Sequence, residues 1–287
     1  MALARIMAEE VLQWLREDMP YWDLTTDALG LEDVCAEAVV IVKSRAVAAC
    51  TAELARALRI LGLDVEAPKK PGEPVEPGDI VLQIRGPAGL LLALERTILN
   101  LLIYAFGVAT QTRRMVDTAR RVAPGVRVAA TRKTPPGLRV CAKRAFAAGG
   151  GDTHRLGLSD AILVKDNHVA LVGDYGEALR RVLEQRSFMH RVEAEASTPE
   201  EALTAARLGV DAVLLDNMSP DEVRETILLL EREGVRSRIV VEASGGITPE
   251  NIAEYAATGV DVVSTSHPLL YPDRVDLSMR MRRLDRC

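Results

Sequence analysis

The chain has 287 residues and a formal net charge of −5, and 48% of its residues are hydrophobic while 3% are aromatic. A chain of this length can bury a sizeable core, either in one large α/β unit or in two domains. The acidic balance argues against a nucleic-acid-binding surface, and so few aromatic side chains leave little on which bases could stack.

The first residues and the cysteines indicate the compartment and the cofactors to expect. Residues 1–17 are predicted to form an amphipathic helix that contains Glu9 and Glu10, which argues against a signal peptide. No run of about 18 apolar residues that could span a bilayer is apparent, so we expect a cytoplasmic protein without a membrane partner. The four cysteines have neither CxxC spacing nor a nearby histidine, which argues against a zinc site. Cys141 is interpreted as a small buried hydrophobe and not as a reactive thiol.

The first part of the chain is predicted to be an α+β domain. Its patterns predict strands at 37–43, 45–50 and 80–85, a helix at 51–61, and a Pro/Gly-rich connector at 65–79. A nearly continuous helix follows over 90–121, and Gly107 is predicted to break it into two helices at a domain boundary. We therefore predict an N-terminal domain over 1–105, joined by residues 271–287, and a second domain over 106–270.

In the second domain, strands alternate with helices. Strands are predicted near 126–130, 161–164, 190–195, 212–215, 238–243 and 260–264. Three of the intervening helices have Ser/Thr-Pro start signals, at Ser197, Ser219 and Thr248. Repeated βα units build a parallel barrel or a doubly wound sheet. Since a complete barrel has about eight strands, we predict an incomplete, open TIM-like β/α barrel.

The ends of these predicted strands carry polar groups one after another. They are Arg132 and Lys133, Lys165, Glu195, Asp216, Ser244 with Gly245 and Gly246, and Ser264 with Thr265 and Ser266. In a parallel barrel the carboxyl ends of the strands meet at one rim, which is where ligands bind. The pattern therefore predicts an active site at this rim.

The stretch from Arg132 to Lys165 is strongly basic within an acidic chain. It contains seven Lys or Arg and two Asp. Three glycines precede His154 and Arg155, which is more than a solvated charged surface needs, so the stretch indicates a site for an anionic ligand. His154 is the best of the four histidines for hydrogen bonding that anion.

Two further groups of residues indicate phosphate and metal chemistry. Glu193 and Glu195 share one face of a strand because side chains alternate. Glu195 with Asp216 is interpreted either as a Mg²⁺ pair or as partners of Lys133 and Lys165; a structural salt bridge is the alternative. Ser244-Gly245-Gly246 precedes a helix start, which suits a phosphate.

A long motif in this region resembles a known enzyme family. It reads T-R-K-x-x-P-G-L-R from Thr131, G-G-G-x-x-H-R-x-G-L-x-D from Gly149, and K-D-N-H from Lys165. This pattern resembles quinolinate phosphoribosyltransferase, and weaker similarity extends over nearly the whole chain. The resemblance implies transfer of phosphoribose from phosphoribosyl pyrophosphate to the nitrogen of quinolinate. The products would be nicotinate mononucleotide, pyrophosphate and CO₂, with Mg²⁺ as cofactor.

The resemblance also implies roles for particular residues. Arg132, Arg155 and His154 would hold the quinolinate carboxylates, with Arg139 in the same basic site. Lys133 and Lys165 would reach both substrates, Glu195 and Asp216 would lie near the ribose and Mg²⁺, and Ser244, Gly245 and Gly246 would bind the 5′-phosphate. Arg96 matches an arginine that family members insert into the site of a partner subunit, which implies at least a homodimer.

Three positions depart from the family pattern. Ser264, Thr265 and Ser266 stand where a small glycine turn is usual, Thr153 replaces an asparagine, and Trp22 replaces a glycine. The first and last regions also resemble a homologue associated with molybdenum transport, which lacks the lysine that this chain has at Lys165. A non-catalytic barrel that binds a sugar phosphate is the other alternative, against which the acidic pair Glu195 and Asp216 counts.

Overall fold

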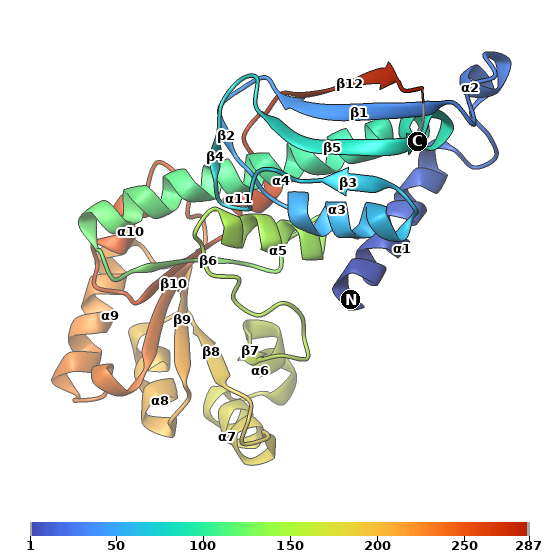
Figure 1. The fold of residues 1–287 in the computed structure, drawn as a ribbon. Coiled ribbons are helices and arrows are strands. Elements are labelled where there is room, and N and C mark those ends of the chain that lie inside the picture. The colour runs from blue at the N-terminus through green and yellow to red at the C-terminus, as the bar shows by residue number, and fades with distance from the viewer. Residues whose placement is uncertain (1, 286–287) are drawn as a thin grey trace. The chain divides into compact units, whose positions relative to one another are not determined.

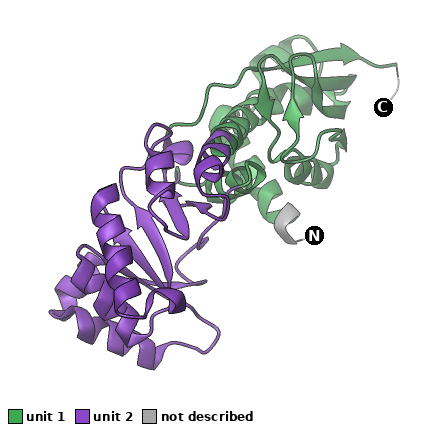
Figure 2. Cartoon of the chain, turned by 90° about the vertical axis from the view of Figure 1, so that its left-hand side faces the viewer, with its two compact units in different colours: residues 1–113, 135–150, 271–287 green, residues 114–134, 151–270 purple. Residues whose placement is uncertain are grey.

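The computed structural model describes residues 2–285, with side chains from residue 5 onward, so Cys287 lies outside the described residues. The chain forms two compact units (Figure 2). Unit 1 comprises residues 1–113, 135–150 and 271–287, and unit 2 comprises residues 114–134 and 151–270. These borders differ from the predicted division at 105/106, and the segment 135–150 belongs to unit 1.

Unit 1 packs helices against an antiparallel sheet with strand order β12-β1-β5-β3, beside a small β2-β4 pair (Figure 1). The helix α3 contacts α1, β3 and β5, and Leu54 and Leu58 of α3 are fully buried. The strand β12, near the C-terminus, pairs with β1. The elements are α1 (Ala2–Asp18), α2 (Leu24–Ala28), β1 (Cys35–Val42), β2 (Ala46–Val47), α3 (Thr51–Ile60), β3 (Asp64–Glu66), β4 (Pro74–Val75), β5 (Ile80–Pro87), the first part of α4 (Ala88–Val122), α5 (Arg139–Ala148) and β12 (Leu277–Arg283).

The strand predicted over 45–50 is mostly absent. Only Ala46–Val47 forms a strand, and Cys50, with a φ of 59°, is already the N-cap of α3. Conversely, the predicted connector 65–79 contains β4 and most of β3. The Sγ atom of Cys141 is buried 3.3 Å from the Sγ of Cys50, in keeping with the hydrophobic interpretation of Cys141.

The predicted break at Gly107 is wrong, because α4 runs unbroken over 35 residues. A Cβ atom at Gly107 would lie 2.4 Å from the carbonyl oxygen of Asp273. Gly107 therefore permits a close approach of two backbone segments and does not end the helix. An 18-residue window of α4 is long and apolar enough to cross a membrane, contrary to our expectation, but 61% of that window is buried. A buried core helix passes the same test, so this is weak evidence for a membrane span.

Unit 2 is the predicted open barrel. Its six parallel strands have the order β6-β11-β10-β9-β8-β7, so β6 and β7, consecutive in the chain, form opposite edges of the sheet. Figure 1 shows the helices α7, α8 and α9 outside the strands β8 to β10. The strands are β6 (Arg127–Ala130), β7 (Ile162–Val164), β8 (Val192–Ala196), β9 (Ala212–Asp216), β10 (Val240–Ser244) and β11 (Val262–Thr265). The helices are α6 (Asp166–Val172), α7 (Tyr175–Gln185), α8 (Pro199–Leu208), α9 (Pro220–Arg232), the 3₁₀ turn η1 (Arg236–Arg238), α10 (Ile252–Ala256) and α11 (His267–Leu270).

Side-chain caps explain where the outer helices begin. Thr198 accepts a hydrogen bond from the N–H of Glu201 at the start of α8, and Ser219 with Glu222 forms a capping box at the start of α9. Two of the three predicted start signals therefore act as expected. At the third signal, the N–H of Thr248 donates to Asn251 Oδ1, and α10 begins only at Ile252.

Candidate active site

Unit 2 contains a cavity of about 400 Å³ at the carboxyl ends of its strands. Residues that follow or end all six strands contribute to its wall, as expected for the rim of a parallel barrel. The lining residues are Ala130, Thr131, Arg132, Lys133, His154, Arg155, Leu163, Lys165, Glu195, Leu214, Asp216, Asn217, Glu242, Ser244, Gly245, Gly246 and Ser264.

Most of the residues predicted from the sequence lie together in this wall. Thr265 does not line the cavity, because its buried hydroxyl donates to the carbonyl of Ile247 at 2.7 Å. Ser266 also lies outside the lining set, and its carbonyl accepts the N–H of Leu269 at the start of α11. Arg96 on α4 and Arg139 on α5 belong to unit 1, so their roles at this site stay predictions.

Lys165 and Glu195 form an ion pair at the ends of two neighbouring strands. Lys165 Nζ lies 2.5 Å from Glu195 Oε2, and the Glu195 side chain is 8% exposed while that of Lys165 is 43% exposed. The N–H of Lys165 donates to Nδ1 of His168 at 3.0 Å. His168, the last residue of the K-D-N-H motif, therefore caps α6, while the lysine reaches into the cavity.

Asp216 and the glycine loop after β10 lie side by side at the rim. The Nδ2 of Asn217 donates to Asp216 Oδ2 at 2.7 Å, and the N–H of Asn217 donates to the carbonyl of Ser244. Gly245 has a φ of 101°, and a Cβ there would lie 2.3 Å from Asn217 Oδ1. Only glycine fits such a position, both for its backbone conformation and for the space available.

Two arginines place positive charge at one side of the cavity. Burial and the nearby charge of Arg132 lower the pKa of Arg155. Two half-buried guanidinium groups repel each other unless an anion lies between or beside them. The charges of Glu193 and Asp160 act on Arg155 in the opposite direction. The arginine pair suits a ligand with carboxylate or phosphate groups, with which guanidinium forms bidentate hydrogen bonds.

Beneath the rim lies a buried cluster that the sequence interpretation did not include. Nε2 of His154 lies 3.2 Å from Glu193 Oε2 and 3.3 Å from Glu242 Oε2. The Glu242 side chain is 4% exposed, and its Oε1 has no hydrogen-bond partner. The spacing in the sequence could have indicated this cluster. Glu193 is two residues before Glu195, and Glu242 is two residues before Ser244. Because side chains two residues apart share a face of a strand, both glutamates point to the barrel interior, below the polar strand ends.

Burial disfavours a charged imidazole, whereas the hydrogen bonds to Glu193 and Glu242 raise the pKa of His154 and hold a proton on its Nε2. Burial and the charge of Glu242 likewise raise the pKa of Glu193. Because Nδ1 of His154 accepts the N–H of Arg155, the ring is neutral, and the extra proton that these shifts favour lies on a glutamate of the cluster.

The His154, Glu193 and Glu242 cluster has the composition of a metal site, but its hydrogen bonds argue against one. Nδ1 of His154 accepts the N–H of Arg155 at 2.7 Å, so the ring carries its proton on Nε2. A protonated Nε2 cannot bind a metal, and a ligating histidine normally donates from its other nitrogen. The cluster is therefore a hydrogen-bonded unit.

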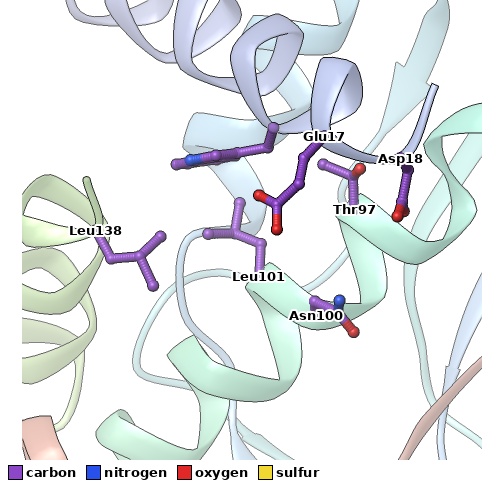
Figure 3. Close-up of a pocket in the computed structure, with 7 residues that line it drawn as sticks. Glu17, Asp18, Thr97, Asn100, Leu101 and Leu138 are labelled. Carbon is purple, nitrogen blue, oxygen red and sulfur yellow. The ribbon is translucent and has the colours of Figure 1, made fainter. Parts of the chain in front are cut away.

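Unit 1 has a cavity of its own, of about 190 Å³, between the end of α1 and α4 (Figure 3). Glu17 and Leu101 point into it, and Leu138 lies at one side. Its lining residues are Trp14, Glu17, Asp18, Thr97, Asn100, Leu101 and Leu138. These include two acids and no cation, so this cavity does not suit an anionic substrate.

Comparison with known proteins gives concordant matches over most of the chain. The quinolinate phosphoribosyl transferase C-terminal domain matches residues 108–280, and the N-terminal domain of the same family matches residues 23–106. A probable nicotinate-nucleotide pyrophosphorylase (carboxylating) from Methanothermobacter thermautotrophicus is 42% identical over 97% of this chain and 100% of its own length. The human nicotinate-nucleotide pyrophosphorylase (carboxylating) is 34% identical over 96% of this chain and 91% of its own length. The solved structure of the nicotinate-nucleotide pyrophosphorylase from Francisella tularensis superimposes with a TM-score of 0.84, at 27% identity, over 98% of this chain and 96% of that one.

Proposed function

Because this chain belongs to the quinolinate phosphoribosyltransferase family, we propose that it transfers phosphoribose from phosphoribosyl pyrophosphate to the nitrogen of quinolinate. The transfer releases pyrophosphate and CO₂ and forms nicotinate mononucleotide, a precursor of NAD. In this reading the enzyme is a pentosyltransferase, a glycosyltransferase of pyridine nucleotide biosynthesis. The observation that carries the proposal is the cavity in unit 2, where Arg132 and Arg155 accompany the Lys165–Glu195 pair.

The two arginines account for the acceptor. Quinolinate has two adjacent carboxylates, and Arg132 and Arg155 supply two guanidinium groups at one side of the cavity. Planar guanidinium groups bind carboxylates directionally and strongly. An acceptor with a single carboxylate would pair with only one of the two guanidinium groups, so we expect quinolinate to be preferred over nicotinate.

The acidic and basic strand ends account for the transfer itself. As pyrophosphate leaves, the ribose C1 becomes oxocarbenium-like, and a carboxylate fixed by an ion pair, such as Glu195, stabilises that charge. Lys133 and Lys165 balance the charge of the phosphates. Loss of CO₂ then follows because the positively charged pyridinium nitrogen stabilises the carbanion at the neighbouring carbon. The chemistry requires no covalent nucleophile.

A Mg²⁺ ion fits the donor atoms at the rim if substrate oxygens supply most of its ligands. In the described part of the chain, the one group of three close His, Cys, Asp or Glu ligands is His154, Glu193 and Glu242, so Asp216 does not belong to such a group. One carboxylate plus substrate phosphates is the usual Mg²⁺ arrangement. Asp216 is its best protein ligand here, since Glu195 Oε2 is already paired with Lys165. When bound, the ion would neutralise the leaving pyrophosphate.

The proposal includes assembly and location. Arg96 would complete the site of a partner subunit in a homodimer, as in the family that the motif resembles, and Arg139 would add to the same basic surface. We place the enzyme in the cytoplasm, where its soluble anionic substrates would be.

A direct assay tests the function. The purified protein is incubated with phosphoribosyl pyrophosphate, Mg²⁺ and either quinolinate or nicotinate, and nicotinate mononucleotide and CO₂ are measured. We expect both products with quinolinate and much slower turnover with nicotinate. No product with quinolinate would reject the proposal, and equal turnover of the two acceptors would reject the role of the arginine pair. The same assay separates the enzyme from the transport-associated homologue and from a non-catalytic sugar-phosphate binder.

A further inference from the structure

Both ring nitrogens of His154 are engaged inside unit 2. Nε2 lies within hydrogen-bond distance of Glu193 and Glu242, and Nδ1 accepts the N–H of Arg155. A histidine held in this way has no nitrogen left for a substrate. Its contribution to the site must therefore pass through the groups to which it is bonded.

The bonds of His154 connect distant parts of the open barrel. Asp152 pairs with Ala129 at the β6 edge of the sheet, while Glu193 lies on β8 and Glu242 on β10, with β9 between these two strands. His154 therefore ties the segment 152–155, beyond one edge of the sheet, to the interior faces of two strands. Arg155 is the next residue, and its guanidinium lines the cavity.

The backbone of His154 adopts a conformation that a histidine disfavours. Its φ is 51°, in the left-handed region that a histidine seldom adopts. The N–H of His154 donates to Asp152 Oδ1 at 2.8 Å. Such conformations persist where several interactions determine them together, and they gather at functional sites.

We propose that Glu193 and Glu242 are positioning residues, which hold Arg155 in the cavity through the Nε2–H of His154. Arg155 in turn receives a carboxylate of the acceptor; this last step rests on the proposed function. Among the described residues, Glu193 and Glu242 face the His154 ring, Asp152 accepts its backbone N–H, and Arg132 and Asp160 lie near Arg155. Two buried acids thus act on substrate binding through His154 and Arg155.

Substitutions of Glu242 distinguish positioning from bulk stability. Glu242→Gln keeps an oxygen that can accept the Nε2–H, whereas Glu242→Leu removes it. We expect Glu242→Leu to raise the KM for quinolinate about tenfold or more, as for loss of a charge-assisted hydrogen bond. The KM for phosphoribosyl pyrophosphate should change much less, and Glu242→Gln should have the smaller effect. Glu37→Gln, at a buried ion-paired glutamate of unit 1, is the control and should leave the quinolinate KM unchanged.

Nitrogen-15 NMR of the labelled histidine ring gives a readout that is independent of activity. We expect a protonated Nε2 and an unprotonated Nδ1 in the wild type and in Glu242→Gln, and a loss of this single state in Glu242→Leu. Should Glu242→Leu not fold, His154→Gln and His154→Leu make the same comparison, because glutamine keeps an N–H donor. An unprotonated Nε2 in the wild type, or an unchanged quinolinate KM in the folded Leu variant, would overturn the positioning role. A wild type that makes no nicotinate mononucleotide would instead reject the proposed function, and the ring spectra would still decide whether the glutamates anchor His154.

Discussion

Lys165 Nζ and Glu195 Oε2 lie 2.5 Å apart, at the ends of two strands that are hydrogen-bonded neighbours in the sheet. The carboxylate is buried and the lysine is partly exposed in the cavity. Each group therefore fixes the other where charge develops during the proposed transfer. Removal of one partner leaves the other charge unpaired, which is destabilising where that charge is buried, so activity and stability must be measured separately.

Removal of either partner should impair turnover far more than folding. We expect Lys165→Ala and Glu195→Ala to lower kcat by about 100-fold or more, as for the loss of one preorganised electrostatic group. Thermal unfolding of both variants is measured alongside. As a control, Arg207→Ala breaks the exposed Arg207–Glu233 pair on the outer helices and should leave kcat unchanged. Near-wild-type turnover in either site variant would reject its assigned role, and an unfolded Glu195→Ala would favour the structural salt bridge.

Dependence on Mg²⁺ should involve Asp216. We expect EDTA to abolish activity, and Asp216→Asn to raise the Mg²⁺ concentration needed for half-maximal rate, because an amide is a weaker ligand than a carboxylate. Asp221→Asn removes an exposed carboxylate at the start of α9 and serves as the control. Titrations of rate against Mg²⁺ at saturating substrate give the comparison. An unchanged Mg²⁺ dependence in Asp216→Asn would mean that the pyrophosphate alone binds the ion.

The barrel was predictable from the sequence because its signals are local. Strands buried on both faces read as short apolar runs, and the polar residues that end them mark the rim. The pairing of side chains within the barrel was not predictable. Glu193 and Glu195 share one face of β8, yet one contacts His154 and the other Lys165. That choice depends on how the segment 152–155 crosses the interior, which no local pattern encodes.

The structure at Gly107 in unit 1 was also not predictable from local sequence. Local propensity predicted a helix break there, but α4 is continuous and the glycine is required by tertiary packing. In a helix, Gly→Ala normally stabilises by about 1 kcal/mol. We expect Gly107→Ala to destabilise instead, by about 1–3 kcal/mol, because its methyl group would meet the carbonyl of Asp273. Urea unfolding measures the change. Gly176→Ala on α7, where the added Cβ has its nearest neighbour at 3.4 Å, is the control and should be neutral or stabilising. A stabilised Gly107→Ala would contradict the close approach.

Glu37 should give unit 1 a stability that depends on pH. Hydrogen bonds from Gln83, Arg85 and Arg282 lower the pKa of Glu37 from 4.5 to about 2. Because the folded pKa is depressed, this contribution is fully present above pH 4.5 and is lost as the pH falls toward 2. We therefore expect Glu37→Gln to be less stable than the wild type at pH 7, with a difference that shrinks in acid.

Denaturant unfolding of the wild type and Glu37→Gln between pH 3 and pH 7 tests this linkage. Glu231→Gln, at an exposed position of α9, should show no such difference at any pH. If the difference in free energy of unfolding between the wild type and Glu37→Gln is the same at every pH in this range, the three partners do not stabilise the ionised form of Glu37.

The shared-site proposal predicts that two inactive variants complement each other. Arg96 lies on α4 in unit 1, whereas Lys165 lines the cavity of unit 2. We expect Arg96→Ala and Lys165→Ala to be inactive alone, and activity to return partly when they are mixed under conditions that allow subunit exchange. In a symmetric dimer with exchanged arginines, a mixed pair has one site with both defects and one site with neither.

The control for complementation is a mixture of Lys165→Ala with Glu195→Ala. These two residues belong to one unit and form one ion pair, so every site in a mixed dimer of this pair carries a defect and activity should stay absent. Exchange itself is verified by mass spectrometry of differently labelled subunits. If exchange is complete and the Arg96→Ala mixture remains inactive, each site is built from a single chain, and Arg96 acts within its own subunit.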